Sequence, residues 1–146
     1  MKKRPFIIDC DTGTDDAIAL MAAVYSPEIE VLAITSVNGN VPHRFTSQNN
    51  LNLMEYLDRD IAVARGAETP LYLREPEYSD THGPAGFGDI ELPAAVKRQF
   101  AKENAIEVIR RNADEHKGEL ELLVIGPMTN IAIALSLYPE LTGQIK

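Results

Sequence analysis

One pattern occurs four times along this chain: a short apolar run, followed by a segment with apolar residues at helical spacing. Such alternation is typical of parallel strands in one sheet with helices between them. It predicts an α/β fold with a Rossmann-like, mainly parallel sheet flanked by helices, in one domain over residues 1–146. The expected strands are residues 5–9, 31–37, 61–64 and 120–125, and the expected helices are residues 15–25, 44–57, 93–112 and 129–138.

The helical spacing also predicts which side chains face the core, and one long stretch breaks the alternation. Residues 65–92 contain several prolines and glycines and are predicted to form an irregular, lid-like loop. The side chains expected to face the core are Ile18, Met21, Ala22 and Tyr25 in the first helix, and Leu51, Met54 and Leu57 in the second.

The composition excludes several classes of function. A net charge of −8 argues against a nucleic-acid partner, because phosphate backbones are bound by basic surfaces. Neither a signal peptide nor a membrane-spanning apolar run is expected from the sequence. Cys10 is the single cysteine and is predicted to be a core residue, which fits a reducing compartment and predicts a cytoplasmic location.

Four aspartates follow the first expected strand closely: Asp9, Asp11, Asp15 and Asp16. They lie where a parallel strand ends and a helix begins, which is the edge of the sheet where α/β proteins bind ligands. No Lys or Arg occurs in residues 5–43, so nothing nearby in the sequence neutralises them. Carboxylates a few ångströms apart repel by about 4 kcal/mol per pair at an effective dielectric near 20, and they must protonate or bind a cation. Oxygen ligands without paired His or Cys favour Ca²⁺ or Mg²⁺.

A structural explanation of the aspartates stays open. Asp15 or Asp16 could cap the helix, while Asp9 and Asp11 could be turn residues. Three other segments that could belong to the same edge also have structural explanations: Asn38-Gly39-Asn40 as a turn, Thr81-His82-Gly83 as surface loop, and Ile125-Gly126-Pro127-Met128-Thr129-Asn130 as a turn in which Thr129 or Asn130 caps the next helix.

Taken together, these motifs resemble the inosine-uridine nucleoside hydrolase family. The residues that carry the resemblance are Asp9-Cys10-Asp11-Thr12-Gly13-Thr14-Asp15-Asp16-Ala17, Gly39-Asn40, His82-Gly83 and Gly126-Pro127-Met128-Thr129-Asn130. Thr12 stands where the family usually has proline. The resemblance implies hydrolysis of the N-glycosidic bond of a ribonucleoside to ribose and free base, with Ca²⁺ in the site.

The same resemblance implies a role for each matching residue. Asp11 and Asp16 would bind Ca²⁺ through their carboxylates and Ile125 through its backbone carbonyl. Asp11 would also take a proton from the water on that ion. Asp15 would bind the ribose 2′ and 3′ hydroxyls, Asn40 would lie near the ribose and base, and His82 near the base. Asp9 would support these ligands.

Members of that family are longer than this chain, and residues 1–146 match only their N-terminal half. An incomplete nucleoside hydrolase fold is therefore expected, with one edge of the sheet left unpaired after the last helix. Association with the missing C-terminal half, or a homo-oligomer of the dimer or tetramer type, is expected from the resemblance. One alternative is a truncated, non-catalytic fragment that at most binds a cation weakly, or merely folds and self-associates through its uncovered edge. The other is a haloacid dehalogenase-type phosphatase in which Asp9-Cys10-Asp11 carries the nucleophile.

Overall fold

The computed structural model describes residues 2–72, 76 and 78–146. Four strands form one parallel sheet in the order β3-β2-β1-β4. The strands are β1 (Arg4–Cys10), β2 (Ile29–Ser36), β3 (Ala62–Arg65) and β4 (Glu121–Val124). Strand β1 lies in the centre, because it pairs with β2 on one side and β4 on the other. The prediction of a parallel α/β sheet is confirmed, with each strand within two residues of its expected bounds.

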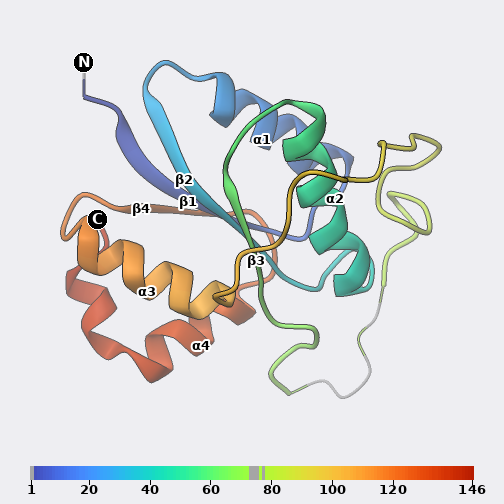
Figure 1. Cartoon of the computed structure of the whole chain (residues 1–146). Helices are drawn as coiled ribbons and strands as arrows, with labels where there is room; N and C mark the ends of the chain where they lie inside the picture. The colour runs from blue at the N-terminus through green and yellow to red at the C-terminus, as the bar shows by residue number, and fades with distance from the viewer. Residues whose placement is uncertain (1, 73–75, 77) are drawn as a thin grey trace.

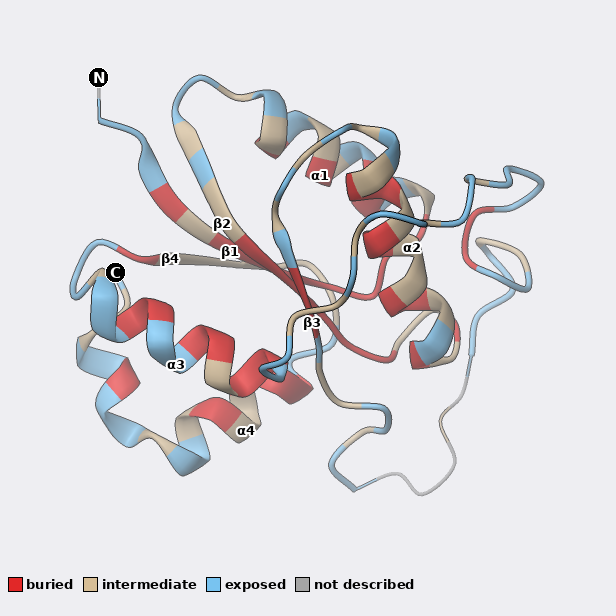
Figure 2. Ribbon diagram, viewed as in Figure 1, coloured by how far each residue is buried: buried red, intermediate tan, exposed pale blue. Residues whose placement is uncertain are grey.

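Helices cover both faces of this sheet, as Figure 1 shows. Helices α1 (Thr14–Tyr25) and α2 (His43–Tyr56) pack with Ile8 and Cys10 on one face. On the other face, Ile7 packs against α3 (Ala105–Glu115), α4 (Thr129–Leu137) and the 3-10 helix η1 (Pro139–Gly143). Cys10 is fully buried, as predicted, and burial raises the pKa of its thiol. Figure 2 shows the resulting concentration of buried residues along the middle of the sheet.

The predicted core face of α1 is largely wrong, since of its four residues only Met21 packs against the core and Ala22 is exposed. Ile18 and Tyr25 are 65% and 59% exposed, whereas the buried apolar residues of the helix are Ala17, Leu20 and Ala23. The helix carries apolar residues on more than one side, so periodicity alone does not fix its rotation. Two alanines on the buried face let the helix approach the sheet closely. In α2, by contrast, Leu51 and Met54 are buried as predicted, and Leu57 packs at the margin of the core.

The predicted helix over residues 93–112 is also wrong in its first part, because α3 begins only at Ala105. Asn104 caps α3 by accepting a hydrogen bond from the Glu107 N–H over 3.0 Å. In the segment before α3, backbone N–H groups donate to a side chain of α2 instead of forming helical hydrogen bonds. The Glu55 carboxylate accepts bonds from three successive N–H groups, those of Val96, Lys97 and Arg98, each over 2.9 Å.

Residues 66–92 contain no helix or strand in their described part, in agreement with the predicted loop, of which residues 73–75 and 77 lie outside the described residues. The edge beyond β4 is not wholly unpaired, since Leu120 forms an isolated parallel bridge with Ile145. No helix in the described part of the chain is long and apolar enough to cross a membrane.

Candidate functional site at the carboxyl ends of β1 and β4

The strand order places a topological switch point between β1 and β4. From β1 the chain moves outward to β2 and β3, and it then returns to form β4 on the other side of β1. Ligands of open α/β sheets bind at such a point, beyond the carboxyl ends of the strands. Asp9 and Asp11 lie at this end of β1, and Ile125 follows β4 directly, so the fold brings together residues that the sequence keeps far apart.

Asp9 is buried at the end of β1 and held from two sides. Its Oδ1 accepts bonds from Thr35 Oγ1 over 2.5 Å and from Asn130 Nδ2 over 2.7 Å. Its Oδ2 is buried without a partner among the described residues. Burial raises the pKa of Asp9 to about 6, although the two hydrogen bonds oppose that shift. The carboxylate of Asp9 is thus oriented by its neighbours.

Asp11 lies in a narrow space between two loops. The backbone N–H of Asn40 donates to its Oδ2 over 2.7 Å. A Cβ on Gly39 would overlap this carboxylate, and a Cβ on Gly126 would lie 2.9 Å from the Asp11 backbone nitrogen. Burial raises the pKa of Asp11. The absence of side chains at both glycines therefore lets the loops after β2 and β4 close around one carboxyl group.

The first turn of α1 presents Asp15 and Asp16 in different surroundings. Asp16 is buried, and its Oδ2 has no partner in the described structure. Burial raises the pKa of Asp16 to about 7, and repulsion from Asp11 and Asp15 adds to the shift. The Asp15 side chain is 70% exposed. Helix α1 has Gly13 as its N-cap and no side-chain capping bond, so neither aspartate serves as the cap.

His82 reaches this cluster from the long loop and is not an ordinary surface residue. Its side chain is only 14% exposed, and Nε2 lies 3.5 Å from Asp15 Oδ1. Its Nδ1 is bonded to Thr14 Oγ1 over 2.9 Å. A Cβ on Gly13 would lie 2.9 Å from the imidazole ring, so the ring packs directly on the start of the helix. The side chains of Asp15 and His82 therefore lie next to each other at the start of α1.

A cavity of about 350 Å³ opens beside Asp11. Its wall combines the loop after β2, the long loop and the turn after β4. Ser79 of the long loop donates its backbone N–H to the Asn40 carbonyl over 3.0 Å, which fixes two of these segments to each other. The lining residues are Asp11, Asn38, Gly39, Asn40, Pro70, Pro76, Ser79, Pro127 and Thr129.

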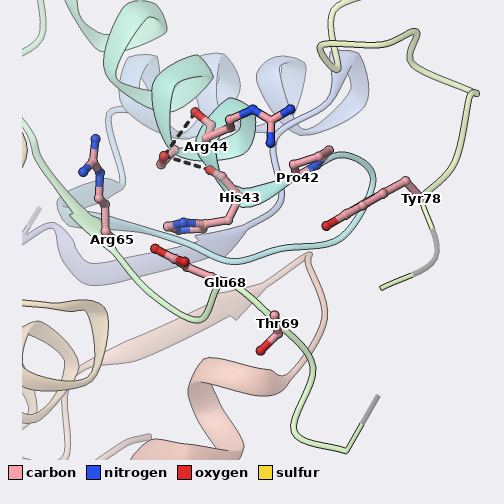
Figure 3. Close-up of a pocket in the computed structure, with 8 residues that line it drawn as sticks. Pro42, His43, Arg44, Arg65, Glu68, Thr69 and Tyr78 are labelled. Carbon is pink, nitrogen blue, oxygen red and sulfur yellow. Dashed lines mark hydrogen bonds between the residues drawn. The ribbon is translucent and has the colours of Figure 1, made fainter. Parts of the chain in front are cut away.

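A second cavity, of about 370 Å³, lies at the start of α2 and is drawn in Figure 3. Its lining includes His43, Arg65 and Glu68 but none of the predicted site residues. His43 Nε2 is bonded to Ser36 Oγ over 3.0 Å, and burial lowers the pKa of this imidazole. Of the acidic cluster, Asp11 lines the first cavity, and none of the four aspartates lines the second.

Several observations bear on whether the cluster fits a cation. The donor set consists of oxygens, and Asp9 and Asp16 each have a buried carboxylate oxygen without a partner among the described residues. Such oxygens lose hydration without compensation unless a cation, a proton or water reaches them. No group of three or more His, Cys, Asp or Glu side chains in the described part of the chain has the geometry of a metal site. Oxygen ligands of this kind are the type that a hard cation prefers, but the His, Cys, Asp and Glu side chains of the described residues do not form a metal site by themselves, so an ion here would need further ligands from carbonyl oxygen or water.

For two residues that contact Asp9, Thr35 and Asn130, no such contact was predicted from the sequence. Thr35, inside β2, bonds to Asp9, and its only sequence signal is a hydroxyl near a strand end. Asn130 belonged to a motif that could lie at the same edge, and the one role considered for its side chain was helix capping, but α4 has Met128 as its N-cap and no side-chain capping bond. The Asn130 amide reaches Asp9 instead.

The fold is that of an α/β protein, and its candidate small-molecule site lies at the carboxyl edge of the parallel sheet. Residues 6–146 match the family model described as "Inosine-uridine preferring nucleoside hydrolase", and the chain belongs to this family. Membership leaves the phosphatase alternative without support.

The sequence comparison and the structural comparison both match this chain to ribonucleoside hydrolases and nucleosidases. The chain is 42% identical over 145 residues to the pyrimidine-specific ribonucleoside hydrolase RihA of Salmonella paratyphi A, covering 97% of this chain and 45% of that protein. It is 35% identical to uridine nucleosidase 1 of Arabidopsis thaliana, covering 99% of this chain and 44% of that protein. The purine-preferring ribonucleoside hydrolase from Gardnerella vaginalis superposes with a TM-score of 0.92 at 33% identity, covering 97% of this chain and 46% of that structure. The chain thus spans less than half the length of these relatives.

Proposed function

We propose that this chain provides the N-terminal part of a ribonucleoside hydrolase site, which cleaves the N-glycosidic bond to give ribose and free base. The observation that carries the proposal is the convergence of Asp11, Asp15 and Asp16 at the switch point of a chain that matches the family over residues 6–146. Glycosidic cleavage needs a water activated by a carboxylate and groups that orient the sugar. This cluster offers both kinds of group.

In this proposal, Asp11, Asp16 and the carbonyl of Ile125 hold a Ca²⁺ ion. When bound, the ion would supply positive charge that lowers the pKa of a water molecule near the anomeric carbon. Asp11 accepts the proton from that attacking water. The Asn40 N–H supports this role, because it fixes one carboxylate oxygen of Asp11 and so sets the direction of the other.

The proposed contacts with the substrate depend on which side chains near Asp11 are accessible to it. Asp15 is the exposed aspartate of the cluster, so its carboxylate is free to accept hydrogen bonds from the ribose 2′ and 3′ hydroxyls. Asn40 lines the cavity beside Asp11 and would contact the ribose and base. His82, which lies next to Asp15, would contact the base from the long loop.

Turnover is best tested in a chimera, because the matching relatives are about twice as long. Residues 1–146 would replace the matching part of Salmonella RihA, and ribose release from inosine and uridine would be measured with Ca²⁺ and with a chelator. We expect Ca²⁺-dependent release that falls by at least about 10³-fold in Asp11→Ala, as for loss of a group central to catalysis. A folded chimera whose activity does not need Asp11 would contradict the proposal.

The alternative of a non-catalytic fragment makes a different prediction for the 146-residue chain itself. Under the proposal this chain binds Ca²⁺ and has a partner, which is either the C-terminal part of the enzyme or further copies in a dimer or tetramer. Light scattering and calcium titration of the purified chain measure these two properties. Because the fragment alternative also allows self-association, calcium affinity decides between the two: absent or only weak calcium binding, whatever the oligomeric state, would favour the fragment alternative.

A further inference from the structure

The side chain of Asn130 joins the ends of three strands, although it belongs to a helix. Its Nδ2 donates to Asp9 Oδ1 over 2.7 Å and to the Ser36 carbonyl over 3.0 Å. Its Oδ1 accepts the Ala67 N–H over 2.8 Å. These partners lie at the end of β1, at the end of β2 and just after β3. Asn130 is fully buried, and both polar atoms of its side chain are used.

Asp9 extends this connection to the fourth strand. Its backbone carbonyl accepts the Ile125 N–H over 2.9 Å and the Gly126 N–H over 3.3 Å. Through Asn130 and Asp9, the carboxyl ends of all four strands are held in one hydrogen-bonded network. Asp11 and Ile125 directly follow β1 and β4, at the strand ends that this network holds together.

The fit around the Asn130 amide is close. A Cβ on Gly66 would overlap both Asn130 Oδ1 and Nδ2, and also the Ser36 carbonyl oxygen. The loop after β3 can therefore pass the amide only because residue 66 has no side chain. A capping role does not account for this arrangement, since α4 makes no side-chain capping bond at its start.

We propose that Asn130 is a positioning residue: its amide fixes Asp9 and the ends of β2 and β3, and thereby sets where Asp11 and the Ile125 carbonyl lie. The inference rests on the proposed function in so far as those two groups hold Ca²⁺. Asn130 itself touches neither substrate nor ion in this assignment. Residues that orient the ligands of a metal typically change its affinity 10- to 100-fold when they are lost.

The test compares Asn130→Ala with Asn112→Ala in the 146-residue chain. Asn112 is also buried in a helix, but its amide donates to the Val108 carbonyl of its own helix, far from the site. Hydrogen exchange of the Asn40 N–H reports on Asp11, because that group donates to its carboxylate. The Ala67 and Ile125 N–H groups report on the strand ends.

We expect Asn130→Ala to speed exchange at Asn40, Ala67 and Ile125 by about tenfold or more relative to the rest of the sheet, whereas Asn112→Ala changes none of them selectively. Ca²⁺ affinity should fall about tenfold or more in Asn130→Ala alone. If Asn130→Ala does not fold, the pair Asn130→Asp and Asn130→Asp/Asp9→Asn replaces it. The double variant restores one donor and one acceptor, and it should recover protection at Ile125.

The outcomes separate the two proposals. Unchanged protection of Asn40 and Ile125 in a folded Asn130 variant overturns the positioning role. Lost protection with unchanged Ca²⁺ affinity also overturns it, because the network would then be structural only. A wild-type chain that binds no Ca²⁺ contradicts the proposed function, and the exchange of Asn40 and Ile125 then decides the positioning role without the ion.

Discussion

Gly39 lies against the carboxylate of Asp11 so closely that a Cβ on the glycine would overlap that group. The contact joins the loop after β2 to the end of β1. It is maintained by the bond from the next backbone N–H, that of Asn40, to the same carboxylate. The position of the Asp11 carboxylate therefore depends on Gly39, a residue without a side chain.

Gly39→Ala should displace the Asp11 carboxylate and weaken Ca²⁺ binding by at least about tenfold, since a ligand must keep its geometry to hold the ion. Gly143→Ala is the matched control, because a Cβ there meets no atom within 4 Å. Isothermal titration of both variants with Ca²⁺ gives the comparison. Equal affinities would show that the loop yields without moving the carboxylate.

Asp11→Ala and Asp15→Ala should differ in their response to calcium. A ligand at 100 times its dissociation constant stabilises a protein by about 2.7 kcal/mol. We expect the wild-type chain and Asp15→Ala to show such a rise in thermal midpoint with Ca²⁺, and Asp11→Ala to show none. Thermal unfolding with Ca²⁺ and with a chelator measures this. The same calcium response in both variants would reject the assigned roles.

The metal-free chain should lose stability as the pH rises from about 4 to 7. In unfolded chains the pKa of an aspartate is about 3.9, but burial raises that of Asp16 to about 7 and that of Asp9 to about 6. The folded state therefore binds more protons than the unfolded state in this window, and the free energy of unfolding falls with increasing pH.

Thermal unfolding in a chelator at pH 5.5 and pH 8 checks this sign. We expect the lower midpoint at pH 8 and a smaller difference in Asp16→Asn, whose amide does not titrate. Glu121 does not interfere, because its hydrogen bond to Arg4 lowers its pKa to about 2 and it stays ionised at both values. His43 contributes the opposite trend, because burial lowers its pKa and the unfolded chain then binds the extra proton. The comparison with Asp16→Asn, which keeps His43, removes this contribution, and an equal change of midpoint in both proteins would contradict the raised pKa of Asp16.

His82→Ala should release the long loop while leaving the sheet intact. The variant loses the bond to Thr14 and the packing on Gly13, which together contribute on the order of 1 kcal/mol locally. Exchange at the Gly88 N–H, which donates to the His82 carbonyl over 2.7 Å, should become faster. His116→Ala, at the end of α3, is the control and should not affect this amide.

The order and type of the elements follow from the sequence because strands and helices of this fold differ in apolar period. The end of β1 was predicted at Asp9 and lies one residue later, at Cys10. The rotation of α1 was not, because Ile18 and Leu20 are equally apolar and only packing against the sheet selects between them. Residues 93–104 were misassigned because Glu55, a residue of another helix, binds their backbone N–H groups.

The composition of the acidic cluster was evident from residue spacing, but the contacts that position it were not. Nothing in the sequence brings His82 to Asp15, since a loop of this length can place a histidine anywhere near the sheet edge. The contacts of Asn130 could not be predicted for a different reason. An asparagine near the start of a helix is expected to bond within that helix, and its actual partners lie on three other segments.

The central place of β1 in the sheet has a consequence for the charge it carries. Paired on both edges and covered on both faces, β1 holds Asp9 in place and also fixes the start of the segment that carries Asp11, so movement of this strand does little to reduce the repulsion between the two carboxylates. Burial and repulsion instead raise the pKa of Asp9 to about 6 and that of Asp16 to about 7, so a proton can take up the charge. Under the proposed function, a small cation would take the place of these protons, and the rigid backbone would favour ions that fit without moving it.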